Sequence, residues 1–317
     1  DLAMKILMIS AEMAPLVKVG GLADVTGALP AAVAAHGHEV RVVLPLYGHL
    51  DRRQWGLQPR PETGPLPLRV GQSVHTVRFW QWPGAPAGVQ VDLVACDSLF
   101  GRPGVYADPA GVVFGDTLER ASALCTAALA LPELLDWPAD VIHAHDVQAA
   151  LAPVYRARWY AGRELPGPAA TLLTIHNLAH QALAPPAAIQ RLGLPRELAD
   201  YPGPFEFHGQ CNPLKAGIVA ADHVNTVSPT YAREVVADPL AGCGLHGVLA
   251  ARGEAFDGIL NGVDARTWDP SRDRHLPARY HVQDLVGKSV CRARLLADAE
   301  LEDHRRPLLG VVGRLVP

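Results

Sequence analysis

The amino-acid sequence predicts an α/β fold, a mostly parallel sheet with helices on both faces. The apolar run 5–10 is typical of a strand that is buried on both sides. Apolar residues then recur at helical spacing over 22–33, and Gly37 is placed to end that helix in a left-handed conformation. A second apolar run, 40–45, follows at once, so the chain opens with a strand–helix–strand unit.

The next hundred residues hold further strands and a second long helix. The polar, proline-rich stretch 51–67 predicts a loop. Alternation over 68–80 predicts one or two strands, and the apolar run 89–94 predicts another. The alanine- and leucine-rich segment 114–131 predicts a helix that stops at Pro132.

Strand and helix patterns alternate again in the second half of the chain. Asp146 is placed to cap a helix, and Ser228-Pro229 reads as a cap followed by a first-turn proline. The Asn261-Gly262 dipeptide predicts a turn. We expect strands at 140–143, 171–176, 223–227 and 258–260, and helices at 146–160, 213–221 and 281–300.

The 317 residues exceed one ordinary domain, and we expect them to divide unevenly. Residues 1–265 form the first domain in this prediction, and 266–306 form a linker and a helix. The apolar run at 307–313 predicts a buried strand. We therefore interpret 307–317 as the first strand of a further domain that the chain lacks.

The composition excludes several classes of partner. A net charge of −4 gives no electrostatic reason to expect nucleic acid or a membrane surface as a partner. The five cysteines are scattered, without a C-x-x-C pair, which favours reduced thiols in a cytoplasmic protein. No signal peptide is evident at the start of the chain, and no stretch is long and apolar enough to span a bilayer.

The stretch 18–25 joins the first strand to the first helix, where open α/β sheets bind ligands. Gly20 and Gly21 lack side-chain bulk, so backbone N–H groups can approach an anion at the helix start. Lys18 adds a mobile positive charge. The spacing is neither a dinucleotide fingerprint nor a P-loop. A plain glycine turn without a ligand is the alternative.

Histidines follow two further strands. His143 and His145 offer two ligands to a metal ion, but no H-E-x-x-H motif or cysteine partner supports such a site, and we predict none. A packed histidine with Asp146 as a helix cap is the structural alternative. His176, with Asn177 beside it, is either a hydrogen-bonded structural residue or a ligand-binding one.

Several of these stretches together resemble one family. Residues 10–15 and 18–25 resemble the N-terminal signature of bacterial glycogen synthases and plant starch synthases, and 141–146, 174–181 and 259–264 resemble further motifs of it in the same order. The resemblance covers residues 5–315. It implies the Rossmann-like N-terminal domain of a two-domain GT-B glycosyltransferase.

The resemblance also implies roles for particular residues. His176 would lie beside the transferred glucose, and Asp146 would orient a sugar hydroxyl. Residues on the substrate side would be Lys18, Gly20, Gly21, Asp24, Tyr106, Asn177, Asn261 and Arg314. Three positions depart from the family pattern, because Val147 replaces Trp, His180 replaces Tyr and Ala182 replaces Gly.

The implied reaction transfers glucose from ADP-glucose to the non-reducing end of an α-1,4-glucan with retention, and without a metal or a cofactor. Because such a site lies between two domains, we expect the 317-residue chain to fold but to be weakly active or inactive by itself. Two alternatives remain at this point. One is a GT-B enzyme with another donor, such as UDP-glucose, and the other is a non-catalytic glucan-binding or scaffold protein.

Overall fold

The computed structural model describes residues 3–159, 169–303 and 306–312. Contacts within the chain divide it into two compact units, Asp1–Gly262 and Val263–Pro317. The division of the chain into domains at 265 and 306 stays a prediction.

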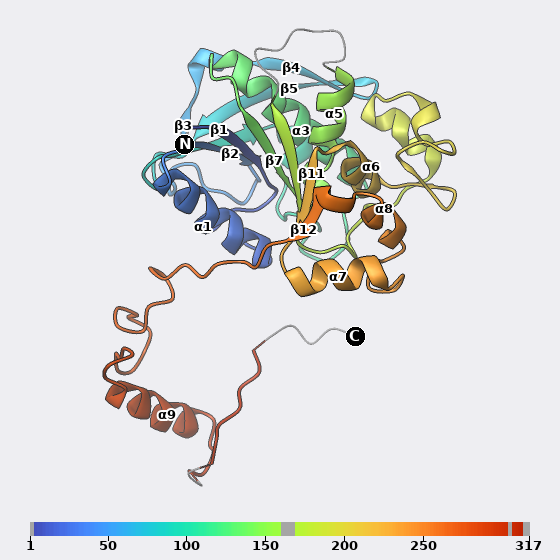
Figure 1. Ribbon diagram of the computed structural model, residues 1–317. Coiled ribbons are helices and arrows are strands. Elements are labelled where there is room, and N and C mark those ends of the chain that lie inside the picture. Colours follow the sequence, from blue (N-terminus) through green and yellow to red (C-terminus); the bar gives the residue numbers. More distant parts are fainter. Residues whose placement is uncertain (1–2, 160–168, 304–305, 313–317) are drawn as a thin grey trace. The chain divides into compact units, whose positions relative to one another are not determined.

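The first unit is built on a ten-stranded sheet with the strand order β12-β11-β8-β7-β1-β2-β6-β5-β3, in which β4 pairs with β5 (Figure 1). The strands from β12 to β6 run parallel, and β3, β4 and β5 are antiparallel to their partners. The small strands β9 (Glu206–Phe207) and β10 (Gln210–Cys211) form a separate pair. The strands of the main sheet are β1 (Lys5–Ile9), β2 (Glu39–Pro45), β3 (Gln58–Pro59), β4 (Leu66–Val70), β5 (Ser73–Gln81), β6 (Val89–Ala95), β7 (Val141–His145), β8 (Ala170–Ile175), β11 (His223–Thr226) and β12 (Phe256–Gly258).

The order of the strands reverses between β1 and β7. From β1 the chain moves outward to β2 on one side, whereas from β7 it moves to β8 on the other. Leu7 of β1 lies in register with Arg41 of β2 and with Ile142 of β7. The loops after β1 and β7 therefore diverge at a topological switch point, where open α/β sheets bind ligands.

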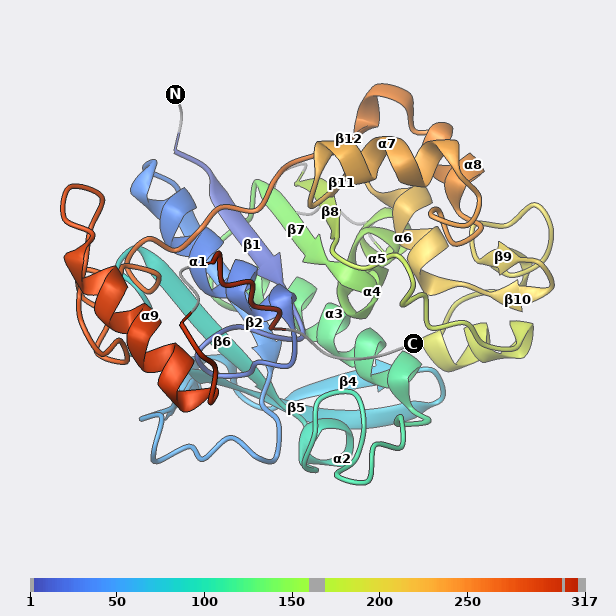
Figure 2. The same ribbon diagram turned by 90° about the horizontal axis from the view of Figure 1, so that it is seen from below.

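Helices cover both faces of the sheet, as predicted (Figures 1 and 2). The right-handed crossovers on the two sides of the switch point run in opposite directions, so α1 lies on one face and α3 to α5 lie on the other. The helices are α1 (Gly21–Ala35), α2 (Asp97–Phe100), α3 (Thr117–Leu134), α4 (Asp146–Ala149), α5 (Leu151–Trp159), α6 (Pro213–Ala220), α7 (Pro229–Ala237), α8 (His246–Ala250) and α9 (Val286–Asp298), with 3-10 turns at Pro61–Thr63, Pro186–Leu192, Arg196–Leu198 and Gly253–Ala255.

Two local signals at helix ends are confirmed. Gly37, just beyond α1, has a φ of 91°, a left-handed conformation that only glycine adopts at little cost. The Ser228 hydroxyl accepts a hydrogen bond from the Tyr231 backbone N–H and so caps α7.

Other boundaries differ from the prediction. The helix α3 continues to Leu134 and contains Pro132 in its last turn. Proline has no backbone N–H, so one hydrogen bond of the helix is absent there, and the helix ends two residues later. The stretch 51–67 holds β3 and a 3-10 turn, because it pairs with β5. The strand β12 ends at Gly258, and Ile259 beyond it is exposed.

The second unit contains α9, which is shorter than the predicted helix over 281–300. Residues 306–312 carry neither helix nor strand, and Leu309 and Val311 are exposed. The prediction that 307–317 begins another domain stays untested, since a strand needs partners to pair with. Arg314 lies outside the described residues.

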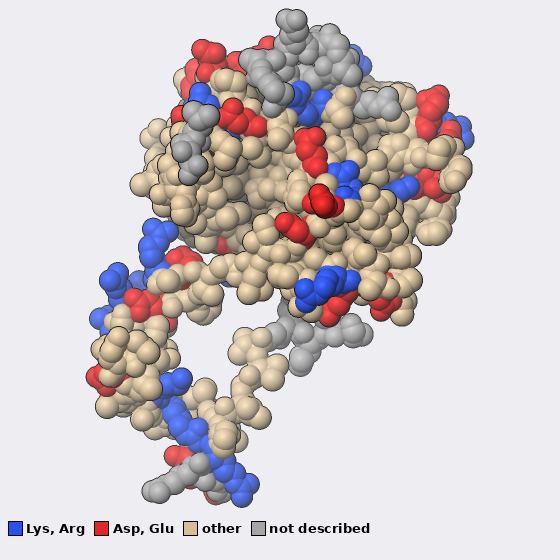
Figure 3. Space-filling view, in the orientation of Figure 1, with Lys and Arg blue, Asp and Glu red and all other residues tan. Residues whose placement is uncertain are grey.

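Charged side chains of both signs are mixed on the face of the first unit seen in Figure 3. Within the described residues, no helix has the length and apolar character needed to cross a membrane. All five cysteines are free thiols, and three of them are buried.

Candidate active site

Asp146 stands at the carboxyl end of β7, directly beside the switch point. Its backbone has a φ of 57°, which turns the chain sharply from strand into α4. The carboxylate Oδ1 accepts the backbone N–H of His176 at 2.7 Å and that of Asn177 at 3.3 Å. The predicted helix cap is wrong, because this carboxylate binds the end of the neighbouring strand β8 instead of the first turn of its own helix.

Burial, and to a smaller degree the nearby charge of Glu12, raises the pKa of Asp146, and the two backbone N–H donors lower it; the net result is a pKa of about 7. Asp146 therefore changes its charge near neutral pH. A carboxyl group poised in this range can hold or release a proton.

Three histidines line up beside Asp146. His145 Nδ1 lies 3.1 Å from His176 Nε2, and the ring centroids of His143 and His145 are 4.1 Å apart. Burial lowers the pKa of His143 to about 3 and that of His176 to about 4, and it also lowers the pKa of His145. All three rings are therefore neutral at pH 7.

A ladder of three buried polar side chains, His143 of β7, Thr174 of β8 and Asn225 of β11, joins these strands by hydrogen bonds. The Thr174 hydroxyl of β8 donates to Asn225 Oδ1 of β11 and lies 2.7 Å from His143 Nε2 of β7. Because the single hydroxyl proton goes to Asn225, His143 donates its Nε2–H to Thr174. The ladder thus fixes the tautomer of His143 and the spacing of β7, β8 and β11.

The loop that follows His176 is held by its own side chains. The Asn177 Oδ1 accepts the Ala179 backbone N–H, and the buried Gln181 amide donates to the Leu178 carbonyl and accepts from Asn212. Ala182 has a φ of 54°, a conformation that favours glycine, at a position where the family pattern has glycine. Ala182 therefore adopts a conformation to which glycine is better suited.

Glu12, in the loop after β1, is the main contact residue on the other side of the switch point. Only 3% of it is exposed. Its Oε2 accepts the backbone N–H groups of Val19 and Gly20, and its Oε1 accepts the Tyr106 hydroxyl at 2.5 Å. The sequence prediction missed this role. The available signal was a lone carboxylate between apolar residues just after a buried strand.

These contacts correct the expectation for Gly20. Its N–H donates to Glu12 at 2.9 Å and is therefore not available to an anion. A Cβ added at Gly20 or at Gly21 would have no heavy atom within 4 Å, so the packing of the protein requires glycine at neither position. Lys18 Nζ pairs with Asp24 at 2.6 Å, and both side chains are half exposed.

Tyr106 belongs to a loop that is fixed by cations and aromatic rings. Arg102 forms an ion pair with Asp116, and its guanidinium lies 4.1 Å from the centre of the Phe114 ring. Arg120 lies 4.7 Å from the same ring. Phe114 also donates its backbone N–H to the Tyr106 carbonyl, so the loop holds Tyr106 toward Glu12.

The structure brings two groups of predicted residues together. Asp146, His176 and Asn177 are in contact, and Tyr106 and Gly20 meet at Glu12, whose charge reaches Asp146. Asn261 is exposed beyond the edge strand β12, three strands away from β7, and Arg314 lies outside the described residues. Among the described residues, no three His, Cys, Asp or Glu side chains could hold a metal ion.

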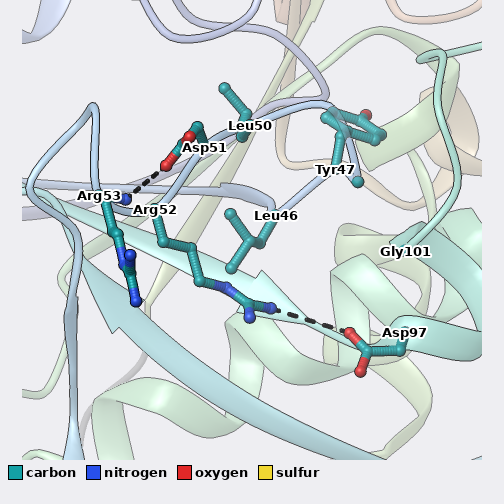
Figure 4. Close-up of a pocket in the computed structure, with 9 residues that line it drawn as sticks. Leu46, Tyr47, Leu50, Asp51, Arg52, Arg53, Asp97 and Gly101 are labelled. Atoms are coloured by element: carbon teal, nitrogen blue, oxygen red, sulfur yellow. Dashed lines mark hydrogen bonds and ion pairs between the residues drawn. The ribbon is translucent and has the colours of Figure 1, made fainter.

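A pocket of about 530 Å³ opens beside this site, over the ends of β2 and β6 (Figure 4). Arg52 pairs with Asp97 at 3.9 Å across it, and Asp51 accepts the Arg53 backbone N–H. None of the predicted site residues lines it. Its lining residues are Leu46, Tyr47, Gly48, Leu50, Asp51, Arg52, Arg53, Asp97 and Gly101.

The fold and this site define a class of protein, namely open α/β domains that bind a polar ligand at the switch point of a parallel sheet. Neutral imidazoles, a carboxyl group and backbone amides suit the hydroxyl groups of such a ligand. The family model of the starch synthase catalytic domain matches residues 5–251, and the chain belongs to this family.

Curated relatives agree with this membership. The chain is 42% identical over 314 residues to a glycogen synthase from Anaeromyxobacter sp. (strain Fw109-5), covering 98% of the chain and 63% of the relative. It is 44% identical over 318 residues to a glycogen synthase from Thioalkalivibrio sulfidiphilus, covering 99% of the chain and 63% of that protein. The chain thus spans less than two thirds of the length of these relatives.

A solved structure confirms the predicted fold class, the Rossmann-like domain of a GT-B glycosyltransferase. It is the catalytic domain of starch synthase IV from Arabidopsis thaliana, bound to ADP and acarbose. The TM-score is 0.87 at 31% sequence identity, and the match covers 100% of this chain and 64% of that one.

Proposed function

We propose that this protein acts as a glycogen synthase, which transfers glucose from ADP-glucose to the non-reducing end of an α-1,4-glucan with retention at the anomeric carbon. The observation that carries the proposal is the joining of Asp146, His176 and Asn177 at the ends of β7 and β8 in a member of the starch synthase catalytic domain family. Its free cysteines suit the cytoplasm as the place of action.

Within this proposal, His176 and Asn177 position the glucosyl unit and Asp146 orients one of its hydroxyl groups. Holding the reactants in place lowers the barrier by several kcal/mol (about 7–11 kcal/mol in the best cases). The neutral imidazole of His176 is suited to this role, since it can donate or accept a hydrogen bond without adding a charge beside the sugar.

The diphosphate of the donor needs positive groups. Lys18 is half exposed and can turn from Asp24 toward a phosphate, and Gly21 leaves open space beside the start of α1. Asn261 and Arg314 are proposed to contact the sugar nucleotide from the far side. Preorganised donors of this kind often supply the largest part of catalysis.

The test is an assay of glucose transfer to glycogen from labelled ADP-glucose by the chain extended to the length of its relatives, with UDP-glucose in parallel and His176→Ala as the low-activity control. Incorporation from ADP-glucose, with new α-1,4 linkages seen by NMR, is the expected result, and the 317-residue chain alone should transfer little or no glucose. The kinetic variants below are measured in the same extended chain. Faster transfer from UDP-glucose would assign a different donor. Glycogen binding without any transfer would support a non-catalytic glucan-binding protein instead.

A further inference from the structure

Two backbone N–H groups of the glycine loop point at a carboxylate of the protein itself. Glu12 Oε2 lies 2.6 Å from the Val19 nitrogen and 2.9 Å from the Gly20 nitrogen. Successive N–H groups of this kind can form a binding site for an anion. Here the protein fills the place with Glu12, so these two amides serve to fix the loop.

The backbone of Glu12 is fixed as firmly as its side chain. The Glu12 carbonyl accepts the hydroxyl of Thr26 on α1 at 2.6 Å and that of Ser10 at 2.8 Å. All three residues are buried. The carboxylate therefore has a defined position from which it reaches both the glycine loop and Tyr106.

Glu12 joins segments that are distant in the sequence. The Tyr106 hydroxyl, 94 residues away, donates to Glu12 Oε1 at 2.5 Å. One buried side chain thus sets the distance between the loop that carries Lys18 and the loop that carries Tyr106. Hydrogen bonds to a charged, buried carboxylate are among the stronger ones in proteins.

The charge of Glu12 also reaches the other half of the site. It raises the pKa of Asp146, in addition to the effect of burial. The other titratable groups that interact with Asp146 are His176, at the end of β8, Tyr106, and Tyr231 of α7. His176 and its neighbour His145 are neutral at pH 7, so Glu12 is the charge that acts on Asp146.

We propose that Glu12 is a positioning residue of the donor site, which fixes the glycine loop against Tyr106. The inference rests on the proposed function for its catalytic meaning, and its geometric part stands without it. Glu12 touches neither substrate in this proposal and acts through Tyr106 and the loop.

Three variants separate the effect of the Glu12 charge from the effects of its hydrogen bonds. In Glu12→Gln, the amide oxygen keeps the Val19 and Gly20 bonds and the Tyr106 hydroxyl turns to accept from the amide nitrogen, so only the charge is lost. In Glu12→Ala, both loop amides lose their acceptor. In Tyr106→Phe, the matched control, one hydrogen bond disappears while the charge and the loop contacts remain.

The first two measurements need no substrate. NMR titration of the Asp146 side-chain carbon should show a midpoint at lower pH in Glu12→Gln than in the wild type, and an unshifted midpoint in Tyr106→Phe. Hydrogen exchange at the Val19 and Gly20 amides should accelerate at least tenfold in Glu12→Ala and stay slow in Glu12→Gln. Circular dichroism checks that each variant is folded.

The third measurement is kinetic. The KM for ADP-glucose should rise about tenfold in Glu12→Ala, with a smaller loss of kcat, and the low-pH limb of activity should move in Glu12→Gln. Unchanged exchange of the two amides in Glu12→Ala, or an unchanged KM for ADP-glucose in a folded Glu12→Ala variant, overturns the proposal. Absence of transfer in the wild-type chain extended to the length of its relatives rejects the proposed function alone, because hydrogen exchange still reports on Glu12.

Discussion

The imidazole of His145 contacts that of His176, with Nδ1 3.1 Å from Nε2. The first ring is buried in β7 and the second stands just after β8, so the bond joins the two strand ends at the switch point. His145 Nε2 has no hydrogen-bond partner within the described part of the chain. The orientation of the His176 ring therefore depends on a neighbour that is not itself placed to touch a ligand.

The first prediction concerns these two histidines. His176→Ala should lower kcat for glucose transfer about 10²-fold, the loss typical of a misplaced reacting group, and leave glycogen affinity nearly unchanged. His145→Leu should lower kcat less, because it frees the His176 ring without removing it. Steady-state kinetics and a glycogen-binding assay measure both. An equal loss of glycogen binding in His176→Ala would place this residue on the acceptor side.

The second prediction concerns Lys18. Its ion pair with Asp24 is half exposed and contributes at most about 1 kcal/mol to stability, so Lys18→Gln should fold normally. If the ammonium binds a phosphate, the KM for ADP-glucose should rise by an amount equivalent to about 1.5–3 kcal/mol. Lys5→Gln, at the opposite end of β1, is the matched control. Equal KM values in the two variants would remove Lys18 from the site.

The third prediction compares two glycines. A Cβ at Gly21 meets no heavy atom within 4 Å, so Gly21→Ala should be as stable as the wild type. The substitution should weaken donor binding only if the bound donor lies against this position. A Cβ at Gly48 would lie 2.2 Å from the Gly101 carbonyl oxygen, so Gly48→Ala should lower the free energy of unfolding by about 1–3 kcal/mol. Urea unfolding and ADP-glucose binding distinguish the two effects. Unimpaired donor binding in Gly21→Ala would show that the ligand keeps away from this position.

The fourth prediction concerns Ala182, whose φ of 54° is unfavourable for a residue with a Cβ. Ala182→Gly should raise the free energy of unfolding by about 0.5–1 kcal/mol, since the strain that is lost exceeds the added entropy of the unfolded chain. Ala179→Gly, in the same loop without a positive φ, should lower it. A loss of stability in both variants would contradict the strain argument.

The fifth prediction is a pH dependence of stability that comes from Asp146. Its pKa in the folded protein, about 7, is higher than the ordinary value of 3.8, so between these values the folded state holds a proton that the unfolded state has released. Stability from this group therefore falls as the pH rises from about 4 to about 7 and then levels off.

Asp146→Asn isolates this effect, because the histidines are common to both proteins. The difference in unfolding free energy, wild type minus variant, should decrease over the same pH window and be constant above it. Urea titrations at several pH values measure it. A difference that rises with pH would mean that Asp146 is held ionised.

The sequence by itself determined the α/β class, the parallel strands β1, β2, β7, β8 and β11, and the ends of α1 and α7. These features rest on local information. Apolar periodicity reports which face of a segment is buried, and Gly37 or Ser228 ends or caps a helix through contacts within a few residues. A resemblance in ordered motifs pointed to the family, which the match over 5–251 shows.

Only the tertiary structure decided how the site is assembled. Asp146 looked like a helix cap because the next residues are helical, yet its carboxylate binds the end of β8, 30 residues away. Glu12 gave no periodic signal, and its partner Tyr106 lies 94 residues further on. Such pairs depend on the order of strands in the sheet and on the free energy of burying a charge, which is favourable only where distant donors converge on it.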